Sequence, residues 1–417
     1  MRLLRIRRPA AEDGVNSDRK NIVVIGAGYG GITTALRASN LFRSSPVYRV
    51  VLVDRYPFHT LKTQLREAAV HKSEVTIDIG RIIRNHDITF QLGAVTALDL
   101  VSRTVRVGDA LIPFEYLVLA LGSQANFYNI PGLEENALPL QSAADAQQIY
   151  EHMSILCAQA SAERDAGKRK EMLRFVVGGG GLSGIELAGE LVDHIADSAR
   201  NYGISSDEPE VVVVEAAEDI LPSSDKVLRQ NTRERLVHKG VKILTRTRVV
   251  GVSRDEVLLS SGEHVRSRTL VWTGGIRISD IARNSGFAIG ESGRILVNAS
   301  LQSVTFPNVY AIGDNALAIN PATGKPVPAA AQFALQQGRL VAENLFAVVR
   351  GKEQRQYHPK VWGEVVSLGR HLAVGWIALP MFKKLKFVGF LASLLKAAIM
   401  EKHIILLRKE SRNWISY

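Results

Sequence analysis

The chain has 417 residues, of which 46% are hydrophobic and 22% charged, a composition typical of a globular protein with room for two or three domains. A single cysteine, Cys157, excludes an intramolecular disulfide and a cysteine-based metal cluster. The ten histidines show no metal-binding spacing, so we expect no metal site. No stretch is long and apolar enough to predict a membrane-spanning helix.

The 52 Lys and Arg residues against 41 Asp and Glu give a net charge of +11, and the excess lies at the two ends. Residues 1–20 carry +3, residues 351–417 carry +8, and residues 21–350 are neutral. A neutral body does not fit a nucleic-acid-binding surface, so we expect no nucleic-acid partner. Residues 1–20 are polar, lack the apolar core of a secretory signal, and are expected to form a flexible basic arm.

Residues 21–54 carry the first functional motif. An apolar run leads into Gly26-x-Gly28-x-x-Gly31 and a helical pattern, and a second apolar run ends in Asp54. Strand, glycine turn, helix, strand and terminal acid together are typical of a dinucleotide-binding unit. The first glycine permits a tight turn, the second admits a pyrophosphate, and the third lets helix and strand pack closely. The acid would accept hydrogen bonds from ribose hydroxyls. The alternative, a tight turn without a ligand, does not explain the flanking strands and acid.

Residues 174–215 repeat this arrangement with Gly179, Gly181, Gly184 and a strand that ends in Glu215. Two such units predict two dinucleotides, and therefore electron transfer between them. Glu215 would pair with both ribose hydroxyls and repel a 2′-phosphate. The next two residues are alanines, which offer no cation to a phosphate, so NADH is favoured over NADPH.

Short alternating strands follow each unit, which predicts a small antiparallel sheet beside each doubly wound sheet. The similar segments LALGS and VWTGGIR indicate two crossings between domains, and their glycines, Gly122 and Gly274, are further candidate cofactor-binding residues. We therefore predict an α/β fold of two Rossmann-like domains, one inserted in the other. The expected limits are an arm over 1–20, a first dinucleotide domain over 21–142 and 266–345, an NADH domain over 143–265, and a membrane-association region over 346–417.

The motifs VYAIGDNA, from Val309, and AAQFALQQG, from Ala330, complete a resemblance to the glutathione-reductase-like two-dinucleotide flavoproteins. Within this superfamily, the AQ-x-A-x-QQ run and the basic tail resemble the type II NADH dehydrogenases, which are single-subunit NADH:quinone oxidoreductases. The resemblance covers residues 21 to about 417. It implies FAD on the first unit, NADH on the second, and a membrane quinone, menaquinone or ubiquinone, as the acceptor.

The resemblance also implies roles for residues of these motifs. Asp314, after the strand end at Gly313, would hold a ribityl hydroxyl of FAD; the alternative is a plain turn aspartate. A helix that begins at Ala331 has small residues that allow close approach to a flat ring. Gln332 and Gln336 would lie near the isoalloxazine and the quinone, where an uncharged amide can both donate and accept hydrogen bonds. The alternative for Gln336 and Gln337 is a solvated helix face.

Two further candidates come from the resemblance. Glu186, in the first turn of the second unit's helix, would lie near the stacked nicotinamide and flavin, with positioning or proton handling as its role; the alternative is a helix-terminus partner. Residues 58–69 occupy the place of the redox cysteines of related disulfide reductases but contain none, so electrons would pass directly from flavin to the acceptor. Lys62 of this segment would stabilise negative charge on the reduced ring, or would be a solvated lysine.

Residues 371–417 alternate apolar residues, among them Trp376, Met381, Phe382, Trp414 and Tyr417, with lysines. These stretches are too short to span a bilayer, and we expect an amphipathic helical tail in the interface of an anionic membrane. The alternative is a helix pair packed on the body or on a second subunit.

The predicted function is thus that of a peripheral NADH:quinone oxidoreductase on the cytoplasmic face of the cell membrane, without proton pumping. A homodimer is compatible with this function. Two alternatives remain open. A soluble NADH:acceptor reductase could serve a ferredoxin or another small acidic protein, because a basic face would attract it equally well. The chain could also be an NADH-sensing flavoprotein with little turnover.

Overall fold

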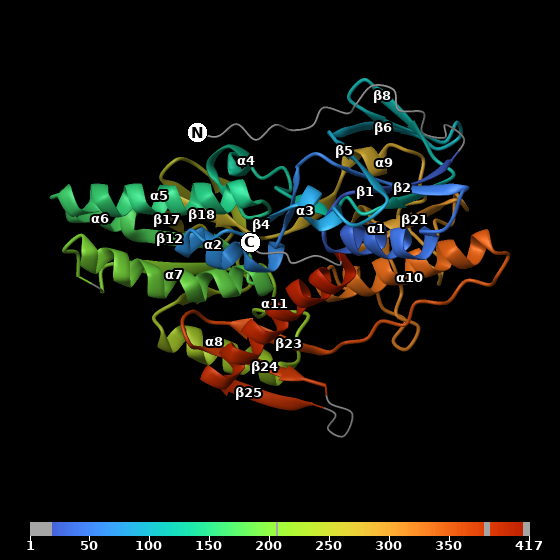
Figure 1. The fold of residues 1–417 in the computed structure, drawn as a ribbon. Helices are drawn as coiled ribbons and strands as arrows, with labels where there is room; N and C mark the ends of the chain where they lie inside the picture. Colours follow the sequence, from blue (N-terminus) through green and yellow to red (C-terminus); the bar gives the residue numbers. More distant parts are fainter. Residues whose placement is uncertain (1–18, 206, 379–383, 412–417) are drawn as a thin grey trace.

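The computed structural model describes residues 19–205, 207–378 and 384–411 (Figure 1). Most of the predicted arm, residues 1–18, and the tail residues Met381, Phe382, Trp414 and Tyr417 lie outside these ranges.

The first unit is built on a five-stranded parallel sheet with the strand order β21-β9-β1-β2-β5. Its strands and main helices are β1 (Lys20–Ile25), α1 (Tyr29–Phe42), β2 (Tyr48–Asp54), β5 (Ile88–Leu92), β9 (Tyr116–Leu119), β21 (Val309–Ala311) and α10 (Ala331–Val349). Ile22 and Val24 of β1 belong to the core that includes α1 and α10. Val23 and Ile25 pack instead with a small antiparallel sheet of β6 (Val95–Asp99), β7 (Thr104–Val107) and β8 (Ala110–Pro113). Because both faces are covered, residues 22–25 of β1 are all apolar.

The second unit has a five-stranded parallel sheet with the order β11-β18-β12-β13-β14. Its strands are β11 (Leu138–Pro139), β12 (Arg174–Gly178), β13 (Glu210–Val214), β14 (Lys242–Leu244) and β18 (Thr269–Trp272). Its helices are α5 (Ala143–Ala162), α6 (Ala166–Leu173), α7 (Leu182–Asn201) and α8 (Lys226–His238), and its small antiparallel sheet comprises β15 (Val249–Val252), β16 (Glu256–Leu259) and β17 (His264–Arg266). The pairing of β11 and β18 extends this sheet beyond the expected limits of 143 and 265, because β18 is buried against β12.

The chain crosses between the units twice, as the segments LALGS and VWTGGIR predict. The two crossings, β10 (Ser123–Ala125) and β19 (Ile276–Ile278), lie side by side as an antiparallel pair. The predicted fold, two Rossmann-like domains with one inserted in the other, is confirmed.

The remaining short elements are β3 (Phe58–Thr60), η1 (Lys62–Gln64), α2 (Leu65–His71), β4 (Thr76–Asp78), α3 (Ile79–Ile83), α4 (Leu133–Asn136), α9 (Asp280–Arg283), η2 (Glu291–Gly293), β20 (Ile295–Leu296), η3 (Gly313–Asn315) and β22 (Ala316–Leu317).

The C-terminal region begins with a three-stranded antiparallel sheet and ends in a long helix. The elements are β23 (Gly363–Ser367), β24 (Ala373–Ile377), β25 (Leu385–Gly389) and α11 (Phe390–Ser411). β23 packs on α7, β24 on α8, and α11 on α1 and α3, so this region bridges both units (Figure 1). Trp376, expected among the membrane-facing residues, is instead only 9% exposed, because β24 lies between α8 and α11. None of the helices in the described ranges has the length and apolar content needed to cross a bilayer.

Candidate functional site

The first glycine loop joins β1 to α1, and its three glycines serve two different purposes. Gly26 has φ +99°, and a Cβ there would lie 2.2 Å from the carbonyl oxygen of Ala120. A Cβ on Gly31 would lie 1.7 Å from the carbonyl oxygen of Gly26. A Cβ on Gly28 would meet no described atom within 4 Å. Gly26 and Gly31 therefore allow the packing of turn and helix, while Gly28 faces open space that a ligand can enter.

The second loop, between β12 and α7, repeats this pattern position by position. Gly179 has φ +110°, and a Cβ on it would lie 2.6 Å from Cα of Gly274, which places Gly274 beside the loop. A Cβ on Gly184 would lie 1.9 Å from the carbonyl oxygen of Gly179, and a Cβ on Gly181 would meet nothing within 4 Å. Gly28 and Gly181 are also the N-cap residues of α1 and α7, and neither helix has a side-chain cap. Two helix N-termini with open access are thus available to phosphate groups.

Each terminal acid binds the glycine loop of its own unit. Oδ2 of Asp54 accepts a hydrogen bond from the backbone N–H of Ala27 at 2.6 Å, and Oε2 of Glu215 accepts one from that of Gly180 at 2.6 Å. The second oxygen of each carboxylate accepts from a backbone N–H two residues further on, at Tyr56 and Ala217 respectively. A carboxylate has about four acceptor positions, so each acid can still receive ribose hydroxyls while it holds the loop.

Asp314 lies at the end of β21, in a turn that three side chains hold. Oγ of Ser123 donates to Oδ2 of Asp314 at 2.7 Å, and Nδ2 of the buried Asn315 donates to the carbonyl oxygen of Gly122 at 2.7 Å. The backbone N–H of Gly313, which has φ +63°, donates to Oε1 of Gln337 at 2.6 Å. Gln337 is 1% exposed and was not among the predicted site residues. Only its helical register, which turns it toward the core face of α10, distinguishes it from Gln336.

Lys62 extends toward the turn that holds Asp314. Its Nζ lies 4.0 Å from the position that a Cβ on Gly122 would take. The side chain is exposed to solvent, yet the protein surrounds it closely enough that loss of hydration lowers its pKa, an effect that the charge of Asp314 opposes. The predicted residues Lys62, Gly122 and Asp314 are therefore brought together, although about 250 residues separate the first from the last.

Glu186, 2% exposed, is the centre of a buried ion cluster. Its Oε2 lies 2.5 Å from Nη2 of Arg66, and its Oε1 lies 3.6 Å from Nζ of Lys396 and accepts from the backbone N–H of Ser367 at 3.0 Å. Lys396 also pairs with Glu67 at 2.7 Å. Burial acts to raise the pKa of Glu186, but Arg66, Lys396 and the Ser367 N–H outweigh it and hold the pKa below its usual value. Glu186 is therefore ionised at neutral pH.

The lysines of residues 371–417 were expected to face an anionic membrane, and for Lys396 the structure contradicts this: its side chain is 13% exposed and points at Glu67 and Glu186. The reason is that α11 packs against the body, so one of its lysines becomes the counter-ion of a buried carboxylate. Neither Lys396 nor Arg66 was predicted as a site residue.

Gln332 and Gln336 lie on the first turns of α10 and bind the chain that follows it. Nε2 of Gln336 donates to the carbonyl oxygen of Lys360 at 2.8 Å, and Oε1 accepts from the N–H of Lys360 at 2.9 Å. Oε1 of Gln332 accepts from the backbone N–H of Trp362 at 3.4 Å. Both glutamines thus hold residues 360–362 against the start of α10, where Ala331 begins a helix without a side-chain cap.

A histidine pair connects the first glycine loop to the C-terminal helix. Nδ1 of His59 donates to the carbonyl oxygen of Ala27 at 2.8 Å, and Nε2 of His59 lies 3.4 Å from Nε2 of His403. The ring of Tyr29 contacts both imidazoles, and its hydroxyl lies 2.7 Å from Oγ1 of Thr63. Loss of hydration on burial lowers the pKa of His59. Burial and the neighbouring His59 together lower the pKa of His403 to about 3. Both rings are neutral and packed against the loop that would carry a pyrophosphate.

The two open, uncapped helix N-termini fit two dinucleotides, and each has an acid at the adjacent strand end. The fold and the site thus define a two-dinucleotide oxidoreductase. The chain belongs to the pyridine nucleotide-disulphide oxidoreductase family, which matches residues 20–338. It is 28% identical over 366 residues to the type II NADH:quinone oxidoreductase of Staphylococcus aureus, covering 86% of this chain and 90% of that protein.

Solved structures show the same fold. The structure of NDH2 from Plasmodium falciparum in complex with NADH has a TM-score of 0.81 at 17% identity, covering 94% of this chain and 98% of that one. The sulfide:quinone oxidoreductase of Aquifex aeolicus has a TM-score of 0.77 at 18% identity, covering 94% and 92%. The family and the fold support FAD and NADH, the two predicted cofactors.

Proposed function

We propose that this chain transfers electrons from NADH, by way of FAD, to a quinone, and that it moves no proton across the membrane. The observation that carries the proposal is the presence of two glycine–acid units in one chain whose segment 58–69 contains no cysteine. Cys157, the only cysteine, is buried in α5, and burial raises its pKa to about 11, so it offers no reactive thiolate. The named quinone-reducing relative supports a quinone as the acceptor.

We assign the first unit to FAD and the second to NADH. FAD would be held by the loop of Gly26, Gly28 and Gly31, by Asp54 and by Asp314; NADH would be held by the loop of Gly179, Gly181 and Gly184, by Glu215 and by Gly274. When bound, FAD supplies the capacity to accept a hydride and to release two electrons. The protein's own groups supply position, charge and exclusion of water.

Glu186 acts in this proposal as a positioning residue. It fixes Arg66 of α2 and Lys396 of α11 against the second turn of α7, one turn later than the sequence predicted, and so joins three separate segments beside the second loop. Lys62 supplies a cation next to Asp314 and Gly122, where negative charge on a bound, reduced cofactor would be balanced. Gln332 and Gln336 keep residues 360–362 over the start of α10.

The C-terminal region supports an acceptor that lives in a membrane. Several large apolar side chains there are exposed, each between 39% and 53%: Val361, Trp362, Leu385, Val388, Leu394 and Ile405. Lys384 and Lys386 lie among them and are themselves exposed. Apolar side chains flanked by lysines favour the interface of an anionic bilayer. We therefore propose peripheral attachment at the cytoplasmic face and a menaquinone or ubiquinone acceptor; a homodimer would be compatible with the same surface.

The test is an absorption spectrum of the purified holoenzyme, recorded before NADH, after NADH under anaerobic conditions, and after a short-chain menaquinone analogue. We expect the flavin band to bleach with NADH and to return with the quinone, together with steady-state NADH oxidation that depends on the quinone. Bleaching with no recovery by any quinone, but with recovery by a ferredoxin, would replace the quinone proposal with the protein-acceptor alternative. Bleaching without turnover would indicate a sensor.

A further inference from the structure

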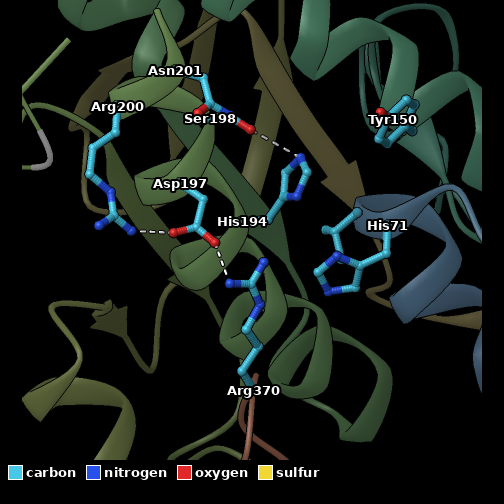
Figure 2. Close-up of a pocket in the computed structure, with 9 residues that line it drawn as sticks. His71, Tyr150, His194, Asp197, Ser198, Arg200, Asn201 and Arg370 are labelled. Carbon is cyan, nitrogen blue, oxygen red and sulfur yellow. Dashed lines mark hydrogen bonds and ion pairs between the residues drawn. The ribbon is translucent and has the colours of Figure 1, made fainter. Parts of the chain in front are cut away.

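A cavity of about 570 Å³ lies at the carboxyl-terminal half of α7, away from both glycine loops (Figure 2). Since α7 has 20 residues, its two ends are about 30 Å apart, and the second loop lies at the opposite end. The cavity is large enough for a small organic ligand. Its lining residues are Val70, His71, Tyr150, His194, Asp197, Ser198, Arg200, Asn201 and Arg370.

The lining comes from four elements of the fold. His194, Asp197, Ser198 and Asn201 follow the three- and four-residue spacing of one helix face, so α7 presents its side, and not its end, to the cavity. Val70 and His71 come from α2, Tyr150 from α5, and Arg370 from the turn between β23 and β24. Figure 2 shows the imidazoles of His71 and His194 next to each other, in an edge-to-face contact with their centroids 5.6 Å apart, and Arg370 reaching Asp197.

Positive charge exceeds negative charge around this cavity. Asp197 is the one carboxylate among the described lining residues, and it is shared: Oδ1 pairs with Arg200 and Oδ2 with Arg370. Two guanidinium groups therefore share one counter-ion. Loss of hydration lowers the pKa of His194, and the neighbouring His71 and Arg370 lower it further against the opposing charge of Asp197. A further anion would relieve the repulsion between the two guanidinium groups.

We propose that this cavity binds a small organic phosphate, at a site separate from the two dinucleotide sites. The guanidinium fork matches a phosphate group with two parallel hydrogen bonds. Oγ of Ser198 and Nε2 of His194 hydrogen-bond each other at 3.2 Å, so the second ring nitrogen of His194 and the amide of Asn201 provide the further donors. The volume exceeds that of phosphate itself, and the ring of Tyr150 offers a flat wall to the organic part.

The cavity is also in contact with the ion cluster of Glu186. Nε2 of His71 lies 3.5 Å from Oε2 of Glu190, and Oε1 of Glu190 accepts from Oγ of Ser367 at 3.1 Å. The N–H of the same serine donates to Glu186. The proposal concerns binding alone, so it does not depend on the proposed reaction.

The test is isothermal titration calorimetry of the full-length holoenzyme with inorganic pyrophosphate at constant ionic strength, with FAD bound and NAD⁺ saturating so that both glycine loops are filled. We expect one saturable site, weakened about tenfold or more in Arg370→Gln and in His194→Gln, because each removes a direct donor. The matched control is Arg106→Gln, which removes the same charge from an exposed position on β7 and should change the affinity less than about twofold.

Arg370 binds the fold through its backbone N–H, which donates to Oδ2 of Asp193 at 2.7 Å, and a side-chain substitution leaves this contact in place. Thermal unfolding of each variant verifies that the fold is retained. The absence of a saturable site with the loops filled would overturn the proposal. So would pyrophosphate binding that NAD⁺ displaces and that Arg370→Gln leaves unchanged, since the anion would then occupy the glycine loops.

Discussion

Nζ of Lys396 lies 3.6 Å from Oε1 of Glu186, so a residue of the last helix completes the ion cluster at the second dinucleotide unit. The C-terminal region is therefore part of the catalytic body as well as a candidate membrane surface. Deleting it would remove the counter-ion of Glu186 and the His403 contact to the first loop together with any membrane contact. Attachment of the protein to a membrane is better tested by single substitutions on the exposed face of α11.

We expect Glu186→Gln to lower the free energy of unfolding by about 3 kcal/mol, because two buried cations, Arg66 and Lys396, then lose a charged partner. Urea unfolding followed by circular dichroism measures this change. The control is Glu343→Gln, whose partners Arg37 and Arg355 are far more exposed and whose loss should cost under about 1 kcal/mol. Equal losses in the two variants would mean that the buried cluster contributes no more than a surface pair.

Gly28→Ala separates a ligand-binding glycine from a structural one. Its Cβ would meet no described atom within 4 Å, and the backbone has φ −72°. The free energy of unfolding of the apoprotein should therefore stay within about 0.5 kcal/mol of the wild-type value. FAD retention after gel filtration should fall sharply, because the methyl group enters the space reserved for the pyrophosphate. Gly251→Ala, with its nearest side-chain contact at 3.6 Å, is the control and should retain FAD. Full FAD retention in Gly28→Ala would contradict the assignment of the first loop.

Glu215→Gln tests the preference for NADH. An amide repels a 2′-phosphate less than a carboxylate does and accepts more weakly from ribose hydroxyls. We expect kcat/KM for NADH to fall about tenfold while the ratio of NADPH to NADH activity rises. Glu218→Gln, at a highly exposed position three residues on, serves as the control and should leave both values nearly unchanged. An unchanged ratio in Glu215→Gln would show that another residue sets the preference.

Acid should destabilise the protein through its buried histidines. The folded pKa of His403 is about 3 and that of His59 is also lowered, whereas the unfolded value is about 6.5. Above pH 6.5 both states are neutral; between pH 6.5 and about 3 only the unfolded chain binds the His403 proton, so stability falls as pH falls. Each such proton contributes about 1.4 kcal/mol per pH unit to the slope.

Urea unfolding at pH 7, 6 and 5 checks this dependence. His403→Gln should flatten the slope, whereas His264→Gln should not, because His264 is exposed and lies on the small sheet of the second unit. A slope that is the same in His403→Gln and in the wild type would mean that this imidazole is protonated in the folded state.

Leu394→Lys and Ile405→Lys test membrane attachment. These residues are 51% and 53% exposed, and their spacing of 11 puts them on one face of α11. Each substitution should lower the fraction that sediments with anionic vesicles about tenfold, since it replaces apolar burial with a charge to be desolvated. Reduction of a soluble dye by NADH should be unchanged. Val101→Lys, on the far side in the first unit and 89% exposed, is the control. Undiminished sedimentation of both α11 variants would exclude this face as the contact.

The glycine loops and their acids could be predicted because their chemistry is local: turn, helix start and strand end lie within about 40 residues. The two strand crossings were predictable for a similar reason, as similar segments mark them. Arg66, Gln337 and Lys396 could not be predicted, because their roles depend on packing between distant segments. The strands of the C-terminal region were missed since an apolar stretch interrupted by lysines fits a surface helix as well as a strand buried between helices.

The sheet of the first unit has a consequence for the order in which the protein is made. Its edge strand β21 (Val309–Ala311) pairs with β9 only after the second unit's residues 138–272 have been synthesised. Domains fold largely as units while the chain emerges, so the sheet of the second unit can form while the first unit still lacks an edge strand, Asp314 and α10. With FAD assigned to the first unit as proposed, we expect flavin capture to be a late event in biosynthesis, and chains truncated before residue 309 should not be able to keep FAD.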